Sequence, residues 1–129
     1  MSEFSFRKGE RLSSKNTISS LFQSGNVVYA SPLKVIFNRT EGNLYPVRMA
    51  VSVPKRLYKR AVDRNLLKRR LREAYRLNKA EFYASLQSNH SQLNMIIQYQ
   101  QQEMAEYVTI EKGLRLALKQ VLQKLEKMI

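Results

Sequence analysis

Three short stretches of apolar residues have the composition or the alternation that predicts β-strands. The first is Leu33–Asn38, which is rich in β-branched and aromatic residues. The second is Val47–Val53, where every second residue is valine or methionine and the residues between them are small or polar. The third is Leu93–Tyr99. One face of the second strand is therefore apolar, and its opposite face is free to be exposed.

Apolar positions three or four residues apart predict three helices. These helices cover Thr17–Gln23, Arg64–Leu77 and Met104–Met128. Asn16 or Thr17 is a suitable N-cap for the first helix, and Gly25 a suitable stop. Asp63 is a suitable N-cap for the second helix. The order of elements is then α-β-β-α-β-α.

This order predicts the α+β class, as a single-domain α-β sandwich in which helices pack on a small mixed sheet. The chain has 129 residues and is 43% hydrophobic, which suits one compact domain over residues 1–129. Residues 1–12 are expected to form an irregular basic arm, and residues 104–129 a C-terminal amphipathic helix.

The net charge of the chain predicts a polyanionic binding partner. Lys and Arg number 23 against 10 Asp and Glu, so the formal net charge is +13. Solubility needs less charge than this, and the self-repulsion opposes compaction. Nucleic acid is the first candidate partner, an anionic membrane surface the second and an acidic protein the third.

The composition also limits the cellular compartments in which we expect to find the protein. The chain has no cysteine, which excludes disulfides, thiolate metal ligands and a cysteine nucleophile. The start of the chain, MSEFSFRKGERL, lacks the apolar core of a signal peptide. No window reaches the roughly 18 apolar residues that a membrane span needs. We therefore expect a soluble, cytoplasmic protein.

The helix over Arg64–Leu77 separates its charge from its apolar side chains. With Arg64 at zero on a helical wheel, its basic face lies between roughly 0° and 140°. That face holds Arg64, Asn65, Lys68, Arg69, Arg72 and Arg76. Leu67, Leu71 and Ala74 lie near 280–340° by the same geometry. Arginine grips phosphate oxygens with two hydrogen bonds, and an asparagine can contact a base edge or a sugar hydroxyl.

Two other interpretations of this helix stay open. A solvated charged face is the usual reason for a run of charges, but here acids that would relieve the repulsion are nearly absent. A basic amphipathic helix can also lie on a membrane, but that needs a bulkier apolar face than this one. Contact with nucleic acid is the interpretation that accounts for both features.

The sequence offers little for independent catalysis. His90 is the only histidine and lies in the polar run QSNHSQ, so a solvated loop residue is expected there. We find no acid pair with metal-ligand spacing, no phosphate-binding glycine loop and no nucleophile motif. We therefore assign no catalytic residue and no metal ligand.

The segment AVDRNLLKRRLREAYR, residues 61–76, resembles the signature of the bacterial ribonuclease P protein subunit. That family opens a basic helix with Arg-Asn-Arg, and Leu66 stands here at the third position. The residues RL at 11–12, LF at 21–22, RMAVSVPKR and NMIIQY are similar to its flanking patterns. The resemblance covers nearly the whole chain, although the family's usual phenylalanine is Ile18 here and the loop at residues 58–60 is longer.

The resemblance implies a left-handed βαβ crossover and a role without chemistry of its own. In this family a large RNA subunit removes the 5′ leader of precursor tRNA, using magnesium, and the protein serves as its cofactor. The partners would be that catalytic RNA and precursor tRNA, with neither DNA nor a membrane. We expect no cofactor bound by the protein itself.

The resemblance also implies two binding surfaces. The contacts with the RNA subunit would be Arg60, Arg64, Asn65, Lys68, Arg69, Arg72 and Arg76. The leader would lie in a cleft lined by Ile18, Phe22, Ile36, Arg48, Ala50 and Ser52, with Lys55 and Arg56 at its edge. Single strands bind where aromatic or apolar platforms meet a positive groove, although Ile18 and Phe22 would also suit an ordinary core.

Two rival functions remain at this point. Composition alone equally permits an RNA-binding module outside ribonuclease P, such as a ribosomal or RNA-chaperone protein. An independent nuclease would need one of the scattered acids to act in cleavage.

Overall fold

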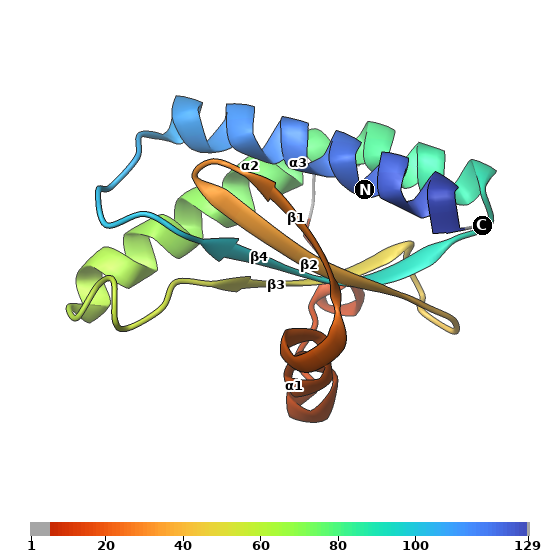
Figure 1. The fold of residues 1–129 in the computed structure, drawn as a ribbon, viewed down its shortest axis with the longest axis horizontal. Coiled ribbons are helices and arrows are strands. Elements are labelled where there is room, and N and C mark those ends of the chain that lie inside the picture. Colours follow the sequence, from red (N-terminus) through yellow and green to blue (C-terminus); the bar gives the residue numbers. More distant parts are fainter. Residues whose placement is uncertain (1–5, 129) are drawn as a thin grey trace.

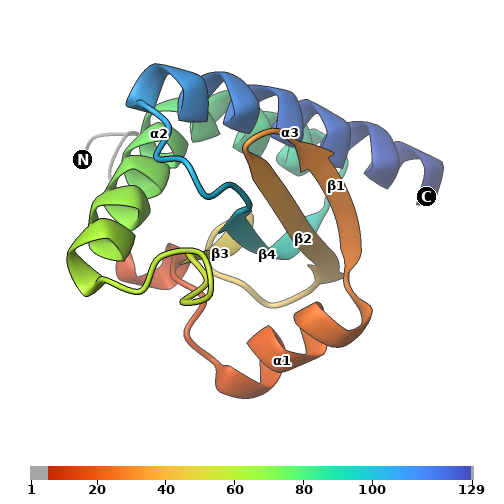
Figure 2. The same cartoon turned by 60° about the vertical axis from the view of Figure 1, so that its left-hand side comes forward.

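The computed structural model describes residues 6–128 of the chain. Its elements are η1 (Lys8–Glu10), α1 (Lys15–Ser24), β1 (Asn26–Ala30), β2 (Leu33–Thr40), β3 (Val47–Ser52), α2 (Ala61–Ser88), β4 (Gln92–Tyr99) and α3 (Tyr107–Met128). The predicted α+β class is confirmed, and every predicted helix and strand is present in the predicted order. The α-helices and the sheet form layers, with α2 and α3 on one face of the sheet and α1 on the other (Figures 1 and 2).

The four strands form one mixed sheet in the order β1-β2-β4-β3. β1 pairs with β2, and β2 with β4, in antiparallel register, whereas β3 and β4 are parallel neighbours. Parallel neighbours need a crossover connection, and α2 supplies it. The left hand that the resemblance implies for this crossover stays a prediction.

Each face of the sheet has its own hydrophobic cluster. The larger cluster joins the sheet to α2 and α3 and includes Phe37, Leu71, Tyr75 and Leu114, each at most 1% exposed. The smaller cluster lies under α1 and consists of Leu12, Leu21, Ile36 and Ile96. Because α1 is short, this second cluster is small, and much of that sheet face stays open to a ligand.

Three details of the elements differ from the prediction. β1 was not predicted, although its sequence NVVYA contains β-branched and aromatic residues. The N-cap of α1 is Ser14, whose hydroxyl accepts a hydrogen bond from the Thr17 backbone N–H at 3.3 Å, so the predicted caps at Asn16 or Thr17 are wrong. α2 begins at Ala61 rather than after Asp63, and it continues to Ser88 because Phe82 and Leu86 extend its buried face.

The predicted basic arm at residues 1–12 extends beyond the described part of the chain, since residues 1–5 lie outside it. Within residues 6–12 the chain forms η1 and then runs beside β3, where Arg11 and Met49 form an isolated parallel β-bridge. The backbone N–H of Leu12 donates to the Met49 carbonyl at 3.1 Å. This segment is therefore fastened to the free edge of β3.

Candidate nucleic-acid interface

The first half of α2 turns its apolar side to the core and its basic side outward. Leu67, Leu71, Ala74 and Tyr75 are each at most 1% exposed, so packing fixes the rotation of the helix. Of the predicted contacts, Arg60, Asn65, Arg69 and Arg72 are exposed, and Arg64, Lys68 and Arg76 are half-buried. The helical wheel drawn from sequence therefore matches the observed orientation.

Two of these basic side chains have partners within the protein. The Arg64 guanidinium donates to the carbonyls of Tyr58 and Lys59, at 2.7 and 2.9 Å, and ties the start of α2 to the preceding loop. Arg76 forms an ion pair with Glu73, whose hydrogen bond raises the pKa of the guanidinium. Arg64 therefore helps to position the basic face of α2, and Arg76 lies at the border of that face.

The middle of the face keeps its charge uncompensated. The ion pairs among residues 6–128 are Arg76–Glu73, Lys79–Glu10 and Arg115–Glu111. None of them involves Lys68, Arg69 or Arg72. Like charges three or four residues apart repel by a few tenths of a kcal/mol per pair, and a phosphate backbone would relieve that repulsion.

The sheet face under α1 is organised in rows that the strand register defines. The central row is apolar and consists of Val27, Ile36, Ile96 and Ala50. The row toward the C-terminal end of β3 consists of Tyr29, Lys34, Gln98 and Ser52, which we call the Tyr29 row. α1 lies over the central row, and the Tyr29 row lies beside it.

The predicted cleft residues fall at different depths on this face. Ile36 is 2% exposed beneath α1, so a ligand would meet half-buried Ile18 and Ala50 before it. Phe22 is 47% exposed on α1 and is free to stack. Ser52 is half-buried and accepts a hydrogen bond from the Gln98 amide at 3.2 Å.

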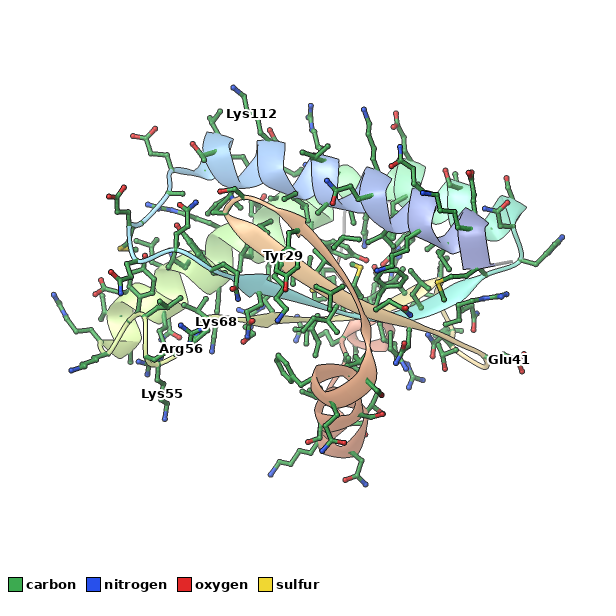
Figure 3. The ribbon with its side chains drawn as sticks, viewed as in Figure 1. Tyr29, Glu41, Lys55, Arg56, Lys68 and Lys112 are labelled. Atoms are coloured by element: carbon green, nitrogen blue, oxygen red, sulfur yellow. The ribbon has the colours of Figure 1, made fainter. Side chains whose placement is uncertain are left out.

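The cationic residues of the predicted cleft are all accessible. Arg48, Lys55 and Arg56 are exposed. Lys55 and Arg56 point outward with Lys68 at the end of the molecule where β3 leads into α2 (Figure 3). Positive charge therefore borders both sides of the corner between β3 and α2.

A groove of about 580 Å³ connects the two predicted surfaces. It lies along the edge of β3 and is lined by Ile18, Ala50 and Val51, by residues of the N-terminal segment, and by Arg72 of α2. Sequence reasoning placed Arg72 only on the RNA-subunit face. The structure brings its side chain to the groove of the predicted leader cleft as well, so the two predicted surfaces are continuous.

A buried polar cluster holds the N-terminal wall of this groove. Glu10 is fully buried, and its carboxylate accepts hydrogen bonds from Lys79 Nζ and the Tyr83 hydroxyl, both at 2.5 Å. A third bond comes from the Arg7 backbone N–H at 3.1 Å. Burial raises the pKa of the Glu10 carboxyl, but these bonds outweigh it and hold that pKa below its usual range. Sequence reasoning missed this cluster because its two charges are 69 residues apart.

Sequence reasoning also missed an exposed aromatic residue on the sheet. Tyr29 is 66% exposed, and the Lys34 ammonium lies 5.9 Å from the centre of its ring. The stretch NVVYA is only five residues long and has no regular alternation of apolar and polar residues, so the sequence did not show which face Tyr29 takes.

No group of three or more His, Cys, Asp or Glu side chains able to hold a metal ion occurs within residues 6–128. Within the same residues, no helix is both long and apolar enough to cross a membrane. His90 is exposed directly after α2, with a positive φ of 53°.

Comparisons with a protein family model and with curated proteins find the same family. The family model for ribonuclease P matches residues 6–125. The ribonuclease P protein component of Porphyromonas gingivalis strain W83 is 33% identical over 116 residues, which cover 89% of this chain and 85% of that protein. The protein component from Chlorobaculum tepidum is 40% identical over 76 residues, covering 56% of this chain and 49% of that protein.

Two solved structures have the same fold. The RNase P protein of Staphylococcus aureus superposes with a TM-score of 0.69 at 22% identity, covering 87% of this chain and 94% of that one. The RNase P protein of Thermotoga maritima gives 0.68 at 22% identity, covering 86% and 96%.

Proposed function

Because this chain belongs to the ribonuclease P protein family, we propose that its basic α2 face binds the ribonuclease P RNA and its β3 groove binds the 5′ leader of precursor tRNA. The chain is the protein subunit of a tRNA-processing endoribonuclease whose catalysis belongs to the RNA. It is a cofactor that binds and positions RNA.

The observation that carries this proposal is the uncompensated face of α2. Its arginines stand on a helix whose rotation is fixed by buried leucines, so the charges are presented in one orientation. Rigid presentation lowers the entropy lost when phosphates are bound. Arg69 and Arg72 are exposed without an ion-pair partner among the described residues, which suits two-pronged phosphate contacts.

The leader assignment rests on the groove beside α1. An apolar floor at Ile18 and Ala50 lies next to the cation of Arg72, and Lys55 and Arg56 continue the positive edge. This combination of an apolar platform and a charged wall is the general form of a single-strand site. Ser52 and Arg48 lie on the same sheet face and would contact sugars and phosphates.

Membership of the family also bears on the domain organisation of the protein, its location in the cell and the source of the magnesium ion. We propose that residues 1–129 act as one RNA-binding domain in the cytoplasm. Residues 6–128 contain no group of three or more His, Cys, Asp or Glu side chains able to hold a metal ion. As the family implies, we assign the ion that the reaction needs to the RNA subunit. By neutralising phosphates, the protein would reduce the magnesium required and favour precursor over mature tRNA.

The test is cleavage of a 5′-labelled precursor tRNA at low magnesium, with bacterial ribonuclease P RNA alone, the protein alone, or both. Cleavage only with both would support the cofactor role. Cleavage by the protein alone would refute it and point to an acid of the chain. Tight RNA binding without stimulation would favour a module that acts outside ribonuclease P.

A further inference from the structure

The Tyr29 row extends the open sheet face beyond the groove that runs along β3. Its members are directly opposite one another in the register, so their side chains share one face of the sheet. Tyr29 on β1 and Ser52 on β3 stand at opposite ends of the row. Three strand spacings separate them, about 14 Å. A single nucleotide therefore cannot contact both ends.

The exposure of Tyr29 has no structural explanation within the described chain. Its side chain is 66% exposed and contributes nothing to either hydrophobic cluster. An exposed tyrosine ring offers a flat platform for a nucleic-acid base. The ammonium of Lys34 beside it would meet the phosphate of the same nucleotide, as in single-strand sites elsewhere.

We propose that Tyr29 and Lys34 form a stacking site for one leader nucleotide that lies farther from the cleavage point than the nucleotides in the β3 groove. This inference rests on the proposed function, because it takes the β3 groove as the path of the leader. The direction follows from the proposed contact of the RNA subunit with α2, which packs on β3, whereas β1 is the opposite edge of the sheet.

The occupant is a single-stranded RNA segment rather than a protein strand or a duplex. Positive charge borders the face at Lys34, Lys55 and Arg56, whereas acidic residues are absent from the central row and the Tyr29 row. Stacking on a tyrosine needs an unpaired base, because a base within a duplex has no open face. The site should accept any base, since every base has a π-face.

The experiment measures binding of precursor tRNAs with leaders of increasing length to the holoenzyme, with and without substitution of Tyr29. Tyr29→Thr removes the ring and keeps a strand-forming residue, so the fold should be unchanged by circular dichroism and thermal unfolding. We expect affinity to fall about fivefold or more for long leaders and not for leaders too short to reach β1. Tyr29→Phe keeps the ring and should stay within about twofold of the unmodified protein.

Matched controls separate stacking from general charge or surface effects. Lys34→Gln should reduce the salt dependence of long-leader binding by about one phosphate contact. Lys112→Gln makes the same charge change on α3, on the other side of the molecule (Figure 3), and should leave leader binding unchanged. Leu44→Ala removes another exposed side chain, 78% exposed, away from the Tyr29 row and should also have no effect.

Each outcome decides the proposal. A length-dependent loss in Tyr29→Thr that Tyr29→Phe does not share supports it. An equal loss for every leader length, or for the RNA subunit alone, overturns it and places Tyr29 against the RNA subunit or the tRNA body. No loss at any length also overturns it, while stimulation of cleavage by the same variant shows that the proposed function still holds. Absence of stimulation by the unmodified protein would instead refute the proposed function.

Discussion

The buried pair of Glu10 and Lys79 provides the sharpest test of how the fold holds its N-terminal segment. Glu10 is fully buried and Lys79 is 2% exposed, so neither charge has water as an alternative partner. Glu10→Gln removes the negative charge while keeping the shape of the side chain. The ammonium of Lys79 then stays buried without this carboxylate, and the N-terminal segment loses one of its attachments to α2.

The size of the loss follows from what remains around the ammonium. Removing one member of a buried ion pair costs about 3–5 kcal/mol. The Lys79 ammonium also lies 5.8 Å from the Phe6 ring centre and 5.4 Å from that of Tyr83. Those ring faces would still attract it, so we expect the lower end of the range, about 3 kcal/mol, for Glu10→Gln. Lys79→Met leaves the buried carboxylate two hydrogen-bond donors but not the ammonium, so it should also cost about 3 kcal/mol.

Urea unfolding followed by circular dichroism at pH 7 measures both losses and their coupling. The double variant should lose less than the two single losses added together, because neither charge is then left alone. In thermal unfolding, 3 kcal/mol corresponds to a fall in Tm of roughly 12 °C for a chain of this size. Glu81→Gln changes an exposed acid on the same helix and should stay within about 0.5 kcal/mol. A loss below about 1 kcal/mol for Glu10→Gln, or strict additivity in the double variant, would refute this account.

Four further predictions follow from the same residues. Binding of the ribonuclease P RNA through ~5–8 phosphate contacts should give a slope of log affinity against log salt of roughly −4 to −7, and a slope near zero in a salt titration would contradict the electrostatic account. Arg69→Glu should weaken binding of the RNA subunit more than binding of the leader, whereas Arg72→Glu should weaken both because Arg72 also lines the groove; equal patterns for the two variants in filter binding would contradict the assignment. Acidification below pH 4.5 should lower the free energy of unfolding, because the lowered pKa of Glu10 stabilises the fold only while the carboxyl is ionised; a Glu10→Gln protein should show a shallower fall. Gly113→Ala would place a methyl group 2.7 Å from the Ser31 carbonyl oxygen, so it should destabilise the protein by about 1–3 kcal/mol in urea unfolding rather than gain the usual helix propensity of alanine.

The elements that could be predicted from sequence are those whose apolar residues follow one period for long enough. β3 and the first half of α2 have strong periodicity, and the structure places both where the pattern does. β1 is only five residues long and gives too few periods to separate it from a loop. In the second half of α2 the buried face includes Lys79 between Tyr75 and Phe82, and lysine is a residue type that pattern reasoning assigns to solvent.

Some residues of the candidate site could likewise be predicted from sequence, and others could not. Local spacing along α2 was sufficient to group Asn65, Lys68, Arg69 and Arg72, because helix geometry alone brings them to one face. The resemblance assigned both Ile36 and Ile18 to the leader cleft. In the structure α1 covers Ile36, whereas Ile18 lines the groove. Neither that difference nor the place of Tyr29 follows from spacing, because both depend on which strands become neighbours.

The distribution of acids explains how one helix is both stable and available to RNA. Residues 61–72 contain five basic side chains and a single acid, Asp63, so this half of α2 repels itself along its length. Burial of Leu67 and Leu71, which are at most 1% exposed, attaches it to the core, and the Arg64 and Arg70 guanidinium groups add hydrogen bonds to backbone carbonyls. The acids Glu10 and Glu73 instead neutralise Lys79 and Arg76, which lie farther along the same helix. Hydrophobic burial thus holds in place a row of charges that the protein does not compensate, and the repulsion within that row adds to the free energy gained when phosphates neutralise it.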